Sequence, residues 1–216
     1  MSLTLVIGNK NYSSWSLRPW LALAHHKVPF DEIVVNLYAD DAKARILAHS
    51  PSGKVPVLKD GEVSIWDTLA ILEYLAEKFP QLNLWPVDAK ARAHARAISA
   101  EMHSGFQGLR QATPMNLKRV PRPIDLPDAA KADIARIEAI WNECRVRYAK
   151  KGPFLFGEFS AADCMYAPVA TRFRTYEVPI GLVSSTYADT IHALPAFERW
   201  REAGLKETWV SHYDSI

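Results

Sequence analysis

The chain has 216 residues, enough for one large domain or two small ones, and 49% of them are hydrophobic, as in ordinary globular proteins. Its 26 basic and 24 acidic residues leave a net charge of +2, so the composition predicts binding neither to nucleic acid nor to an anionic membrane. No apolar run reaches the roughly 18 residues that a membrane-spanning helix needs. Strand and helix patterns alternate along the first 80 residues. In chain order they predict a strand at 3–7, a helix at 14–26, a strand at 30–36, a helix at 41–49, strands at 57–59 and 62–65, and a helix at 67–79.

Cysteine usage and the N-terminal sequence bear on cofactors and location. Cys144 and Cys164 stand apart, with no spacing typical of a redox dithiol or a zinc site, so no metal is expected. Free thiols and the lack of a basic leader at the N-terminus predict a cytoplasmic protein.

The pattern changes near residue 80 and is helical from there on. Pro80 ends the preceding helix, and residues 81–88 read as a linker. Alternation before this point predicts a mixed sheet flanked by helices, and we expect domains at 1–80 and 89–216. The second part predicts a helix at 89–108, a proline-rich loop at 113–127, a helix at 128–150, a helix that begins with the capping pair Ser160 and Asp163, and a short helix at 195–203.

The segment from Ser50 to Leu58 is the most informative in the chain. A Gly53-Lys54 turn leads into Val55-Pro56 and then into a short strand. Proline lowers the cost of a cis peptide bond, and a cis bond here would turn the N–H and C=O of Val55 towards a ligand beside the sheet edge. A plain turn before a strand is the alternative for this dipeptide alone.

Four motifs, in the right order and on the predicted elements, carry a family resemblance. They are Asn11-Tyr12-Ser13-Ser14-Trp15-Ser16-Leu17-Arg18, Ser50-Pro51-Ser52-Gly53-Lys54-Val55-Pro56, Asp67-Thr68-x-Ala70-Ile71-x-x-Tyr74-Leu75, and Ser160-Ala161-Ala162-Asp163. Together they resemble the cytosolic glutathione transferases, and most closely the serine-type, zeta-like members. The resemblance implies a thioredoxin-like N-terminal domain that binds glutathione, an all-α C-terminal domain, a homodimer and a role in detoxification.

Two departures from the zeta pattern bear on the activity. Trp15 stands where zeta enzymes usually have cysteine, and Leu17-Arg18-Pro19 replaces their Trp-Arg-Val-Arg. These changes weaken the expectation of maleylacetoacetate isomerase activity. Asp67-Thr68 replaces the usual Gln-Ser but keeps an acceptor and a hydroxyl donor.

The resemblance implies a set of groups around glutathione. Asp67 would pair with the γ-glutamyl amine, and Thr68 would donate to the γ-glutamyl carboxylate from a helix N-terminus. The Val55-Pro56 backbone would pair with the cysteinyl part like a strand, and Lys54 would reach the glycine carboxylate. A simple N-cap role for Asp67, and a solvated turn for Lys54, are the alternatives.

The thiol needs a hydrogen-bond donor that stabilises its anion. Ser13 aligns with the catalytic serine of zeta enzymes, and Ser14 is the second candidate. An N-cap without chemistry is the alternative for both. Tyr12 is a rival donor because other transferase classes use a tyrosine. Arg18 is expected on the exposed face of its helix, and a contribution of positive charge near the thiolate is the alternative.

The second substrate should lie between the thiol and the helical part, beside Tyr12, Trp15, His103, Phe106, Arg110 and Met115. We therefore predict that the thiolate of bound glutathione attacks a small apolar electrophile. A glutathione-dependent isomerase and a non-catalytic binding or scaffold protein of the same fold are the alternatives. An omega-type thiol–disulfide enzyme would need a cysteine at the first helix, where this chain has serine and tryptophan.

Overall fold

A four-stranded mixed sheet forms one side of the molecule. The computed structural model describes residues 3–215, without the side chains of His212 and Ser215; residues 1, 2 and 216 of the predicted domain ranges lie outside the described residues. The strand order is β2-β1-β3-β4, with β1 and β2 parallel and the other pairs antiparallel. This arrangement confirms the predicted mixed sheet. The strands are β1 (Leu3–Gly8), β2 (Phe30–Val35), β3 (Val57–Asp60) and β4 (Val63–Trp66).

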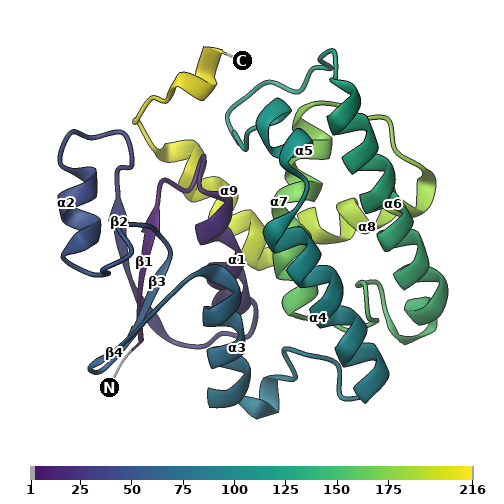
Figure 1. Cartoon of the computed structure of the whole chain (residues 1–216), viewed down its shortest axis with the longest axis horizontal. Helices are drawn as coiled ribbons and strands as arrows, with labels where there is room; N and C mark the ends of the chain where they lie inside the picture. The colour runs from purple at the N-terminus through teal and green to yellow at the C-terminus, as the bar shows by residue number, and fades with distance from the viewer. Residues whose placement is uncertain (1–2, 216) are drawn as a thin grey trace.

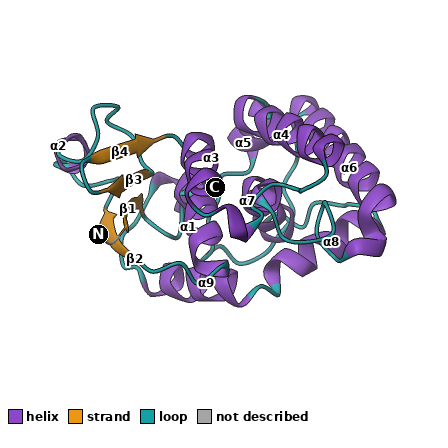
Figure 2. Cartoon of the chain, turned by 90° about the horizontal axis from the view of Figure 1, so that it is seen from below, coloured by secondary structure: helices purple, strands orange, loops and turns teal. Residues whose placement is uncertain are grey.

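Helices cover both faces of this sheet because the side chains of β1 alternate between two cores. Leu5 and Ile7 point into the main core with α1 (Ser14–His25) and α3 (Thr68–Lys78). Val6 points the other way, into a small cluster with Ile46 of α2 (Ala42–Leu47). Figure 2 shows the strands between α2 on one side and α1 and α3 on the other.

The rest of the chain is helical and packs around α7 (Ala161–Thr175). Every residue of α7 except Arg174 is buried, and α7 contacts α1, α4 and α8, so one continuous core joins the two sides of the molecule. Figure 1 shows this group of helices beside the sheet. Its other members are α4 (Ala89–Ser104), α5 (Gln107–Ala112), α6 (Asp128–Tyr148), α8 (Leu182–His192) and α9 (Pro195–Lys206); short 3-10 turns occur at Pro80–Leu82, Ala149–Lys151 and His212–Ser215.

The structure differs from the predicted helices in two places. The expected helix at 89–108 ends at Ser104, because Gly105 is extended and Phe106 has a positive φ of 60°, which together break the helix before α5. The helix α8 was missed altogether. Its buried residues are few and partly polar, so its periodicity in the sequence is weak.

The C-terminal segment returns from α9 to the start of α1 (Figure 1). There the carboxylate of Glu207 accepts the backbone N–H groups of Lys10 and Asn11, at 2.6 and 3.0 Å. The loop before α1 is thus held by residues almost 200 positions later in the chain. None of the helices between residues 3 and 215 is long and apolar enough to cross a membrane.

Candidate active site between α1, α3 and the helical part

A first cavity, of about 680 Å³, opens beside the loop that precedes β3. The peptide bond between Val55 and Pro56 is cis. All five residues predicted to bind glutathione line this cavity, although they come from two separate places, the loop before β3 and the start of α3. The lining consists of Trp15, Ser52, Lys54, Val55, Pro56, Trp66, Asp67, Thr68, His103 and Ser104.

Asp67 has a structural role as well as a place in this cavity. Its side chain caps α3, and one carboxylate oxygen accepts the N–H of Leu69 at 2.9 Å. The other oxygen lies 3.3 Å from Nε2 of His103. Asp67 has a φ of 76°, which is uncommon for a residue with a side chain, and 43% of its side chain is exposed. A ligand ammonium group can therefore reach it from the cavity.

Thr68 uses its hydroxyl differently from the prediction. The side chain is buried and donates a hydrogen bond to the backbone carbonyl of Trp15, at 2.8 Å. The hydroxyl proton therefore joins α3 to α1 and does not face a ligand. The backbone N–H of Thr68, in the first turn of α3, keeps the anion-binding position that the sequence indicated.

A second cavity, of about 350 Å³, lies at the N-terminus of α1. Trp15 lines both cavities, so this one residue borders each of the two spaces. The second cavity also contains the two candidate serines. Its lining consists of Tyr12, Ser13, Ser14, Trp15, Leu37, Tyr38, Gln107, Arg110, Pro114, Met115, Arg172 and Tyr213.

Two arginines lie against Trp15. The guanidinium carbon of Arg18 is 4.3 Å from the ring centroid and that of Arg110 is 4.6 Å from it. Arg18 is fully buried, so the prediction of an exposed helical arginine was wrong. Its Nε donates to the carbonyl of Met165 at 3.1 Å, while Nη1 and Nη2 have no partner within residues 3–215. Burial, together with Arg110 and Arg172, lowers the pKa of Arg18.

Arg110 also closes the end of α4. Its guanidinium donates to the carbonyls of Met102, His103 and Gly105. Because these are carbonyls of the last turn of α4 and its C-cap, a cation here is favourable for the helix. Arg110 therefore has a structural role, and it also lines the second cavity, where a substrate contact stays a prediction.

The candidate hydroxyl groups differ in their surroundings. Tyr12 is buried, and its hydroxyl donates to the carboxylate of Asp214, with distances of 2.9 and 2.7 Å to the two oxygens. Burial and this carboxylate raise the pKa of Tyr12 to about 12. Ser13 caps α1, accepting the N–H of Ser16 at 3.4 Å. Ser14 is the first residue of α1, and its oxygen lies 3.4 Å from Nη2 of Arg172.

Two predicted substrate residues lie elsewhere. His103 lines the first cavity, where its ring packs edge-on against Trp15 with centroids 5.3 Å apart, and it is absent from the lining of the second cavity. Phe106 is buried in the main core and lines neither cavity. Its positive φ turns the chain sharply after α4, which periodicity could not anticipate.

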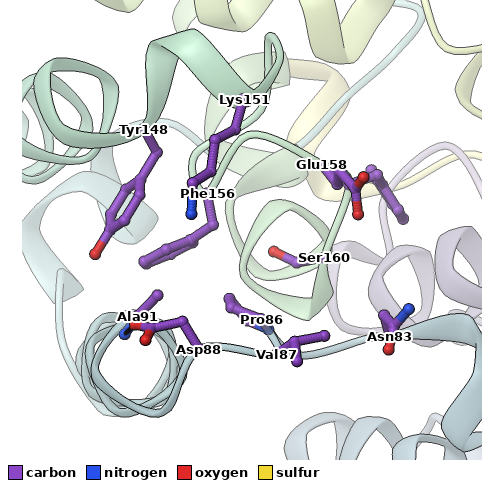
Figure 3. Close-up of a pocket in the computed structure, with 11 residues that line it drawn as sticks. Asn83, Pro86, Val87, Asp88, Ala91, Tyr148, Lys151, Phe156, Glu158 and Ser160 are labelled. Atoms are coloured by element: carbon purple, nitrogen blue, oxygen red, sulfur yellow. Dashed lines mark hydrogen bonds between the residues drawn. The ribbon is translucent and has the colours of Figure 1, made fainter.

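A third cavity, of about 290 Å³, contains none of the predicted site residues. It lies between the start of α4, where Asp88 and Ala91 are found, and the end of α6, where Tyr148 is found (Figure 3). Tyr148 packs on Phe156 with ring centroids 5.0 Å apart. Across the described part of the chain, no group of three or more His, Cys, Asp or Glu side chains could hold a metal ion.

The sequence interpretation missed two charged residues that contact the candidate hydroxyl groups: Arg172, which lines the second cavity, and Asp214, which lies outside that lining. Arg172 lies three residues after Val169 on the buried face of α7, and a charged residue within an apolar stripe is a signal that could have been used. Asp214 gives no such signal, because its partners Tyr12 and Asn116 are distant in the sequence.

Both halves of the chain match known protein families. Residues 12–78 match the sequence model of the glutathione S-transferase N-terminal domain, and residues 127–203 match that of the C-terminal domain. A probable maleylacetoacetate isomerase from Caenorhabditis elegans is 42% identical over 193 residues, covering 86% of this chain and 87% of that protein. A maleylacetoacetate isomerase from Rattus norvegicus is 31% identical, covering 78% and 77%.

Solved structures share the fold. A glutathione transferase homologue from Burkholderia GL BGR1, crystallised with bound glutathione, superposes with a TM-score of 0.71 at 19% identity and covers 94% of this chain and 98% of that one. Structural similarity at this low identity supports the fold alone. The family membership rests on the two family models and on the relatives that share 31–42% of the sequence. The chain is therefore an enzyme of the glutathione S-transferase family.

Proposed function

We propose that this protein binds glutathione in the first cavity, activates its thiol at the N-terminus of α1, and transfers the glutathionyl group to a small electrophile in the second cavity. The observation that carries this proposal is the position of Trp15, which lines both spaces. An extended tripeptide is about 10 Å long, so its thiol can lie at the shared wall while its ends reach the residues around Asp67 and Lys54.

The proposed contacts match the three parts of glutathione. Asp67, partly exposed at the cavity, accepts the γ-glutamyl ammonium, and the backbone N–H of Thr68 donates to the γ-glutamyl carboxylate. Val55 offers its backbone to the cysteinyl part. Lys54 is exposed and lines the same cavity, where its ammonium group suits the glycine carboxylate.

Thiol activation needs no general base. A free thiol has a pKa near 8.5, and lowering it by about 2 units takes about 2.7 kcal/mol of preferential stabilisation of the anion. One hydrogen bond from a serine of the Ser13–Ser14 pair contributes about 1.5–3 kcal/mol, and the N-terminus of α1 adds about 0.3–1 kcal/mol. The resulting thiolate attacks the electrophile, and the sulfur–carbon bond forms with the electron pair of the sulfur. In a substitution the leaving group departs with the electron pair of its bond to carbon, and in an addition the π electrons move to the neighbouring atom, which takes a proton from water.

A second candidate function is glutathione-dependent isomerisation of a small carboxylate. It is favoured by the charge of the second cavity, where Arg110 and Arg172 are the charged residues in the described lining and no carboxylate accompanies them. Two arginines with no carboxylate in the same lining attract an anion. The relatives named maleylacetoacetate isomerase support the same candidate. Addition of the thiolate, rotation about the weakened double bond and loss of the thiolate would complete that reaction without net consumption of glutathione.

The test begins with capture on immobilised glutathione and a calorimetric affinity. Two matched electrophiles follow, one bearing a carboxylate and the other its methyl ester, with conjugation and double-bond isomerisation measured separately. Conjugation that is faster than isomerisation supports a transferase. Isomerisation without loss of glutathione supports the second candidate. Failure to bind glutathione at millimolar concentration would favour the non-catalytic scaffold.

Three further features stay proposals that follow from the family resemblance. They are a homodimer, a cytoplasmic location with a detoxifying role, and a division into residues 1–80, 81–88 and 89–216. The two family matches, at 12–78 and 127–203, lie on either side of the proposed linker and support this division. Size-exclusion chromatography with light scattering tests the dimer.

A further inference from the structure

The hydrogen bonds around the start of α1 distinguish the three hydroxyl groups that compete for the thiol. The hydroxyl of Ser13 is already hydrogen-bonded within the first turn of α1. Its hydroxyl donates to Oγ of Ser16 at 2.8 Å and accepts the N–H of the same residue. Oγ of Ser16 in turn accepts the N–H of Gly8 at 3.0 Å, which ties this pair to the end of β1. The proton of Ser13 therefore points into the protein.

The hydroxyl of Tyr12 is also engaged in a hydrogen bond. It donates to the carboxylate of Asp214, a stronger acceptor than a neutral group. To serve a thiolate, Tyr12 would have to give up a charge-assisted hydrogen bond. Its raised pKa, about 12, also makes it a poorer donor than an ordinary phenol.

Ser14 differs from Ser13 and Tyr12 because its hydroxyl proton is free within the described part of the chain. Its oxygen accepts from Nη2 of Arg172 at 3.4 Å, and its proton takes no acceptor among the groups that the structure describes. Ser14 is also part of the lining of the second cavity. A hydroxyl that accepts from a cation and has a free proton is oriented and polarised to donate to an anion.

Arg172 is held too firmly to move away from Ser14. Its Nε donates to the carbonyl of Thr113 at 2.8 Å, its Nη1 donates to the carbonyl of Pro168 at 3.2 Å, and only 4% of the residue is exposed. Arg110 of α5 and the phenols of Tyr176 and Tyr213 are the titratable groups that act on it. Burial and Arg110 lower the pKa of Arg172 to about 10, so the guanidinium stays charged at neutral pH.

We propose that Ser14, and not the aligned Ser13, donates the hydrogen bond that stabilises the glutathione thiolate, and that Arg172 is the positioning residue that directs the Ser14 proton into the cavity. This inference rests on the proposed function, because it concerns the thiol of glutathione bound there. In this proposal the hydroxyl of Ser13 only caps α1, and the hydroxyl of Ser14 stabilises the thiolate.

The experiment measures the thiol pKa of bound glutathione from the ultraviolet absorbance of the thiolate as a function of pH, beside the glutathione Kd from calorimetry. Ser14→Ala should raise the thiol pKa by about 1–2 units, which lowers the thiolate fraction at pH 7 about 3- to 25-fold from a starting pKa near 6.5. Ser13→Ala should leave the thiol pKa within about 0.3 units of the unmodified protein. Ser14→Thr, which keeps a hydroxyl, should restore most of the effect.

The role of Arg172 is tested by comparing Arg172→Lys with the double variant Ser14→Ala/Arg172→Lys. If Arg172 acts through Ser14, the single variant raises the thiol pKa, and the double variant titrates like Ser14→Ala alone. Circular dichroism and the glutathione Kd show that each variant is folded. Should Arg172→Lys fail to fold, the comparison of Ser14→Ala with Ser14→Thr still decides the assignment of the donor.

Each outcome separates this inference from the proposed function. A raised thiol pKa in Ser13→Ala, with Ser14→Ala unchanged, would overturn the assignment of Ser14 while glutathione binding stands. Equal shifts in both variants would overturn it as well. Loss of glutathione binding by the unmodified protein would instead remove the proposed function itself.

Discussion

The hydroxyl of Tyr12 lies 2.9 and 2.7 Å from the two carboxylate oxygens of Asp214, and this contact joins the loop before α1 to the C-terminal turn of the chain. The same carboxylate accepts Nδ2 of Asn116 and the N–H of Ser211, both at 2.9 Å. Burial acts to raise the pKa of Asp214, but the hydrogen bonds from Ser211, Tyr12 and Asn116 outweigh it and leave the pKa below its ordinary value.

Tyr12→Phe should lower the free energy of unfolding without changing thiol activation. The lost bond is charge-assisted, so we expect a loss of about 1.5–3 kcal/mol in urea unfolding at neutral pH. The thiol pKa of bound glutathione should stay constant, because the phenol donates to Asp214. Tyr148→Phe is a matched control, since its hydroxyl takes no partner among residues 3–215, and it should cost less than about 0.5 kcal/mol.

The pH dependence of this contribution follows from the pKa of Tyr12, which rises from 10 in the unfolded chain to about 12 in the folded protein. Between these values the unfolded chain loses the phenolic proton first, so stability falls as pH rises. The difference between the unmodified protein and Tyr12→Phe should be complete below pH 10 and shrink towards pH 12. A difference that stays constant over this range would contradict the assignment.

Asp67→Asn should separate the capping role of Asp67 from its charge. Asparagine is as good an N-cap as aspartate, so the free energy of unfolding should change by less than about 0.5 kcal/mol. Removing the negative charge should weaken glutathione binding about 10- to 100-fold, since a hydrogen bond to a charged group contributes about 1.5–3 kcal/mol. Calorimetric titration with glutathione measures this loss.

A matched substitution at another helix cap controls for indirect effects. Asp88 caps α4, accepting the N–H of Ala91 at 2.8 Å, and lies outside the lining of the first two cavities. Asp88→Asn should therefore leave glutathione affinity unchanged within about 2-fold. Equal losses of affinity in both variants would mean that Asp67 does not contact the ligand.

Thr68→Val replaces a buried hydroxyl with a methyl group of similar size. The carbonyl of Trp15 would lose its 2.8 Å donor, and we expect stability to fall by about 1–3 kcal/mol. Glutathione affinity should change less than about 3-fold if only the backbone N–H of Thr68 serves the ligand. Thr68→Ser keeps the donor and should retain most of the stability. A large loss of affinity in Thr68→Val at unchanged stability would restore the original prediction for this hydroxyl.

Arg18→Met removes a buried cation that has two unpaired nitrogens. Because an unpaired buried charge is unfavourable, stability should stay equal or rise by up to about 4 kcal/mol, even though the contact with Trp15 is lost. If the thiolate lies beside Trp15 as proposed, its pKa should rise by on the order of 1 unit, because the guanidinium carbon of Arg18 is 4.3 Å from the centroid of that ring. Denaturant unfolding and thiolate absorbance measure the two effects. A less stable protein with an unchanged thiol pKa would show that Arg18 acts in packing alone.

The order of strands and helices in the first 80 residues, the loop around Val55 and Pro56, and the capping pair at Ser160 could be predicted from the sequence by itself. Each depends on neighbours within a few residues: the alternation of side chains in a strand, the rings of proline, or a side chain that reaches the amide three positions later. For the same reason, Asp67 could be placed at the start of α3 before its surroundings were known.

Only the tertiary structure decided how the side chains at the site are used. Ser13 and Ser14 are chemically identical in sequence, and they differ because Arg172, 158 positions further along the chain, approaches only one of them. Arg18 is buried because α7 packs against α1, a contact that helical periodicity does not contain. Long-range packing determines which proton is free, because a hydroxyl donates only once and folding selects its acceptor.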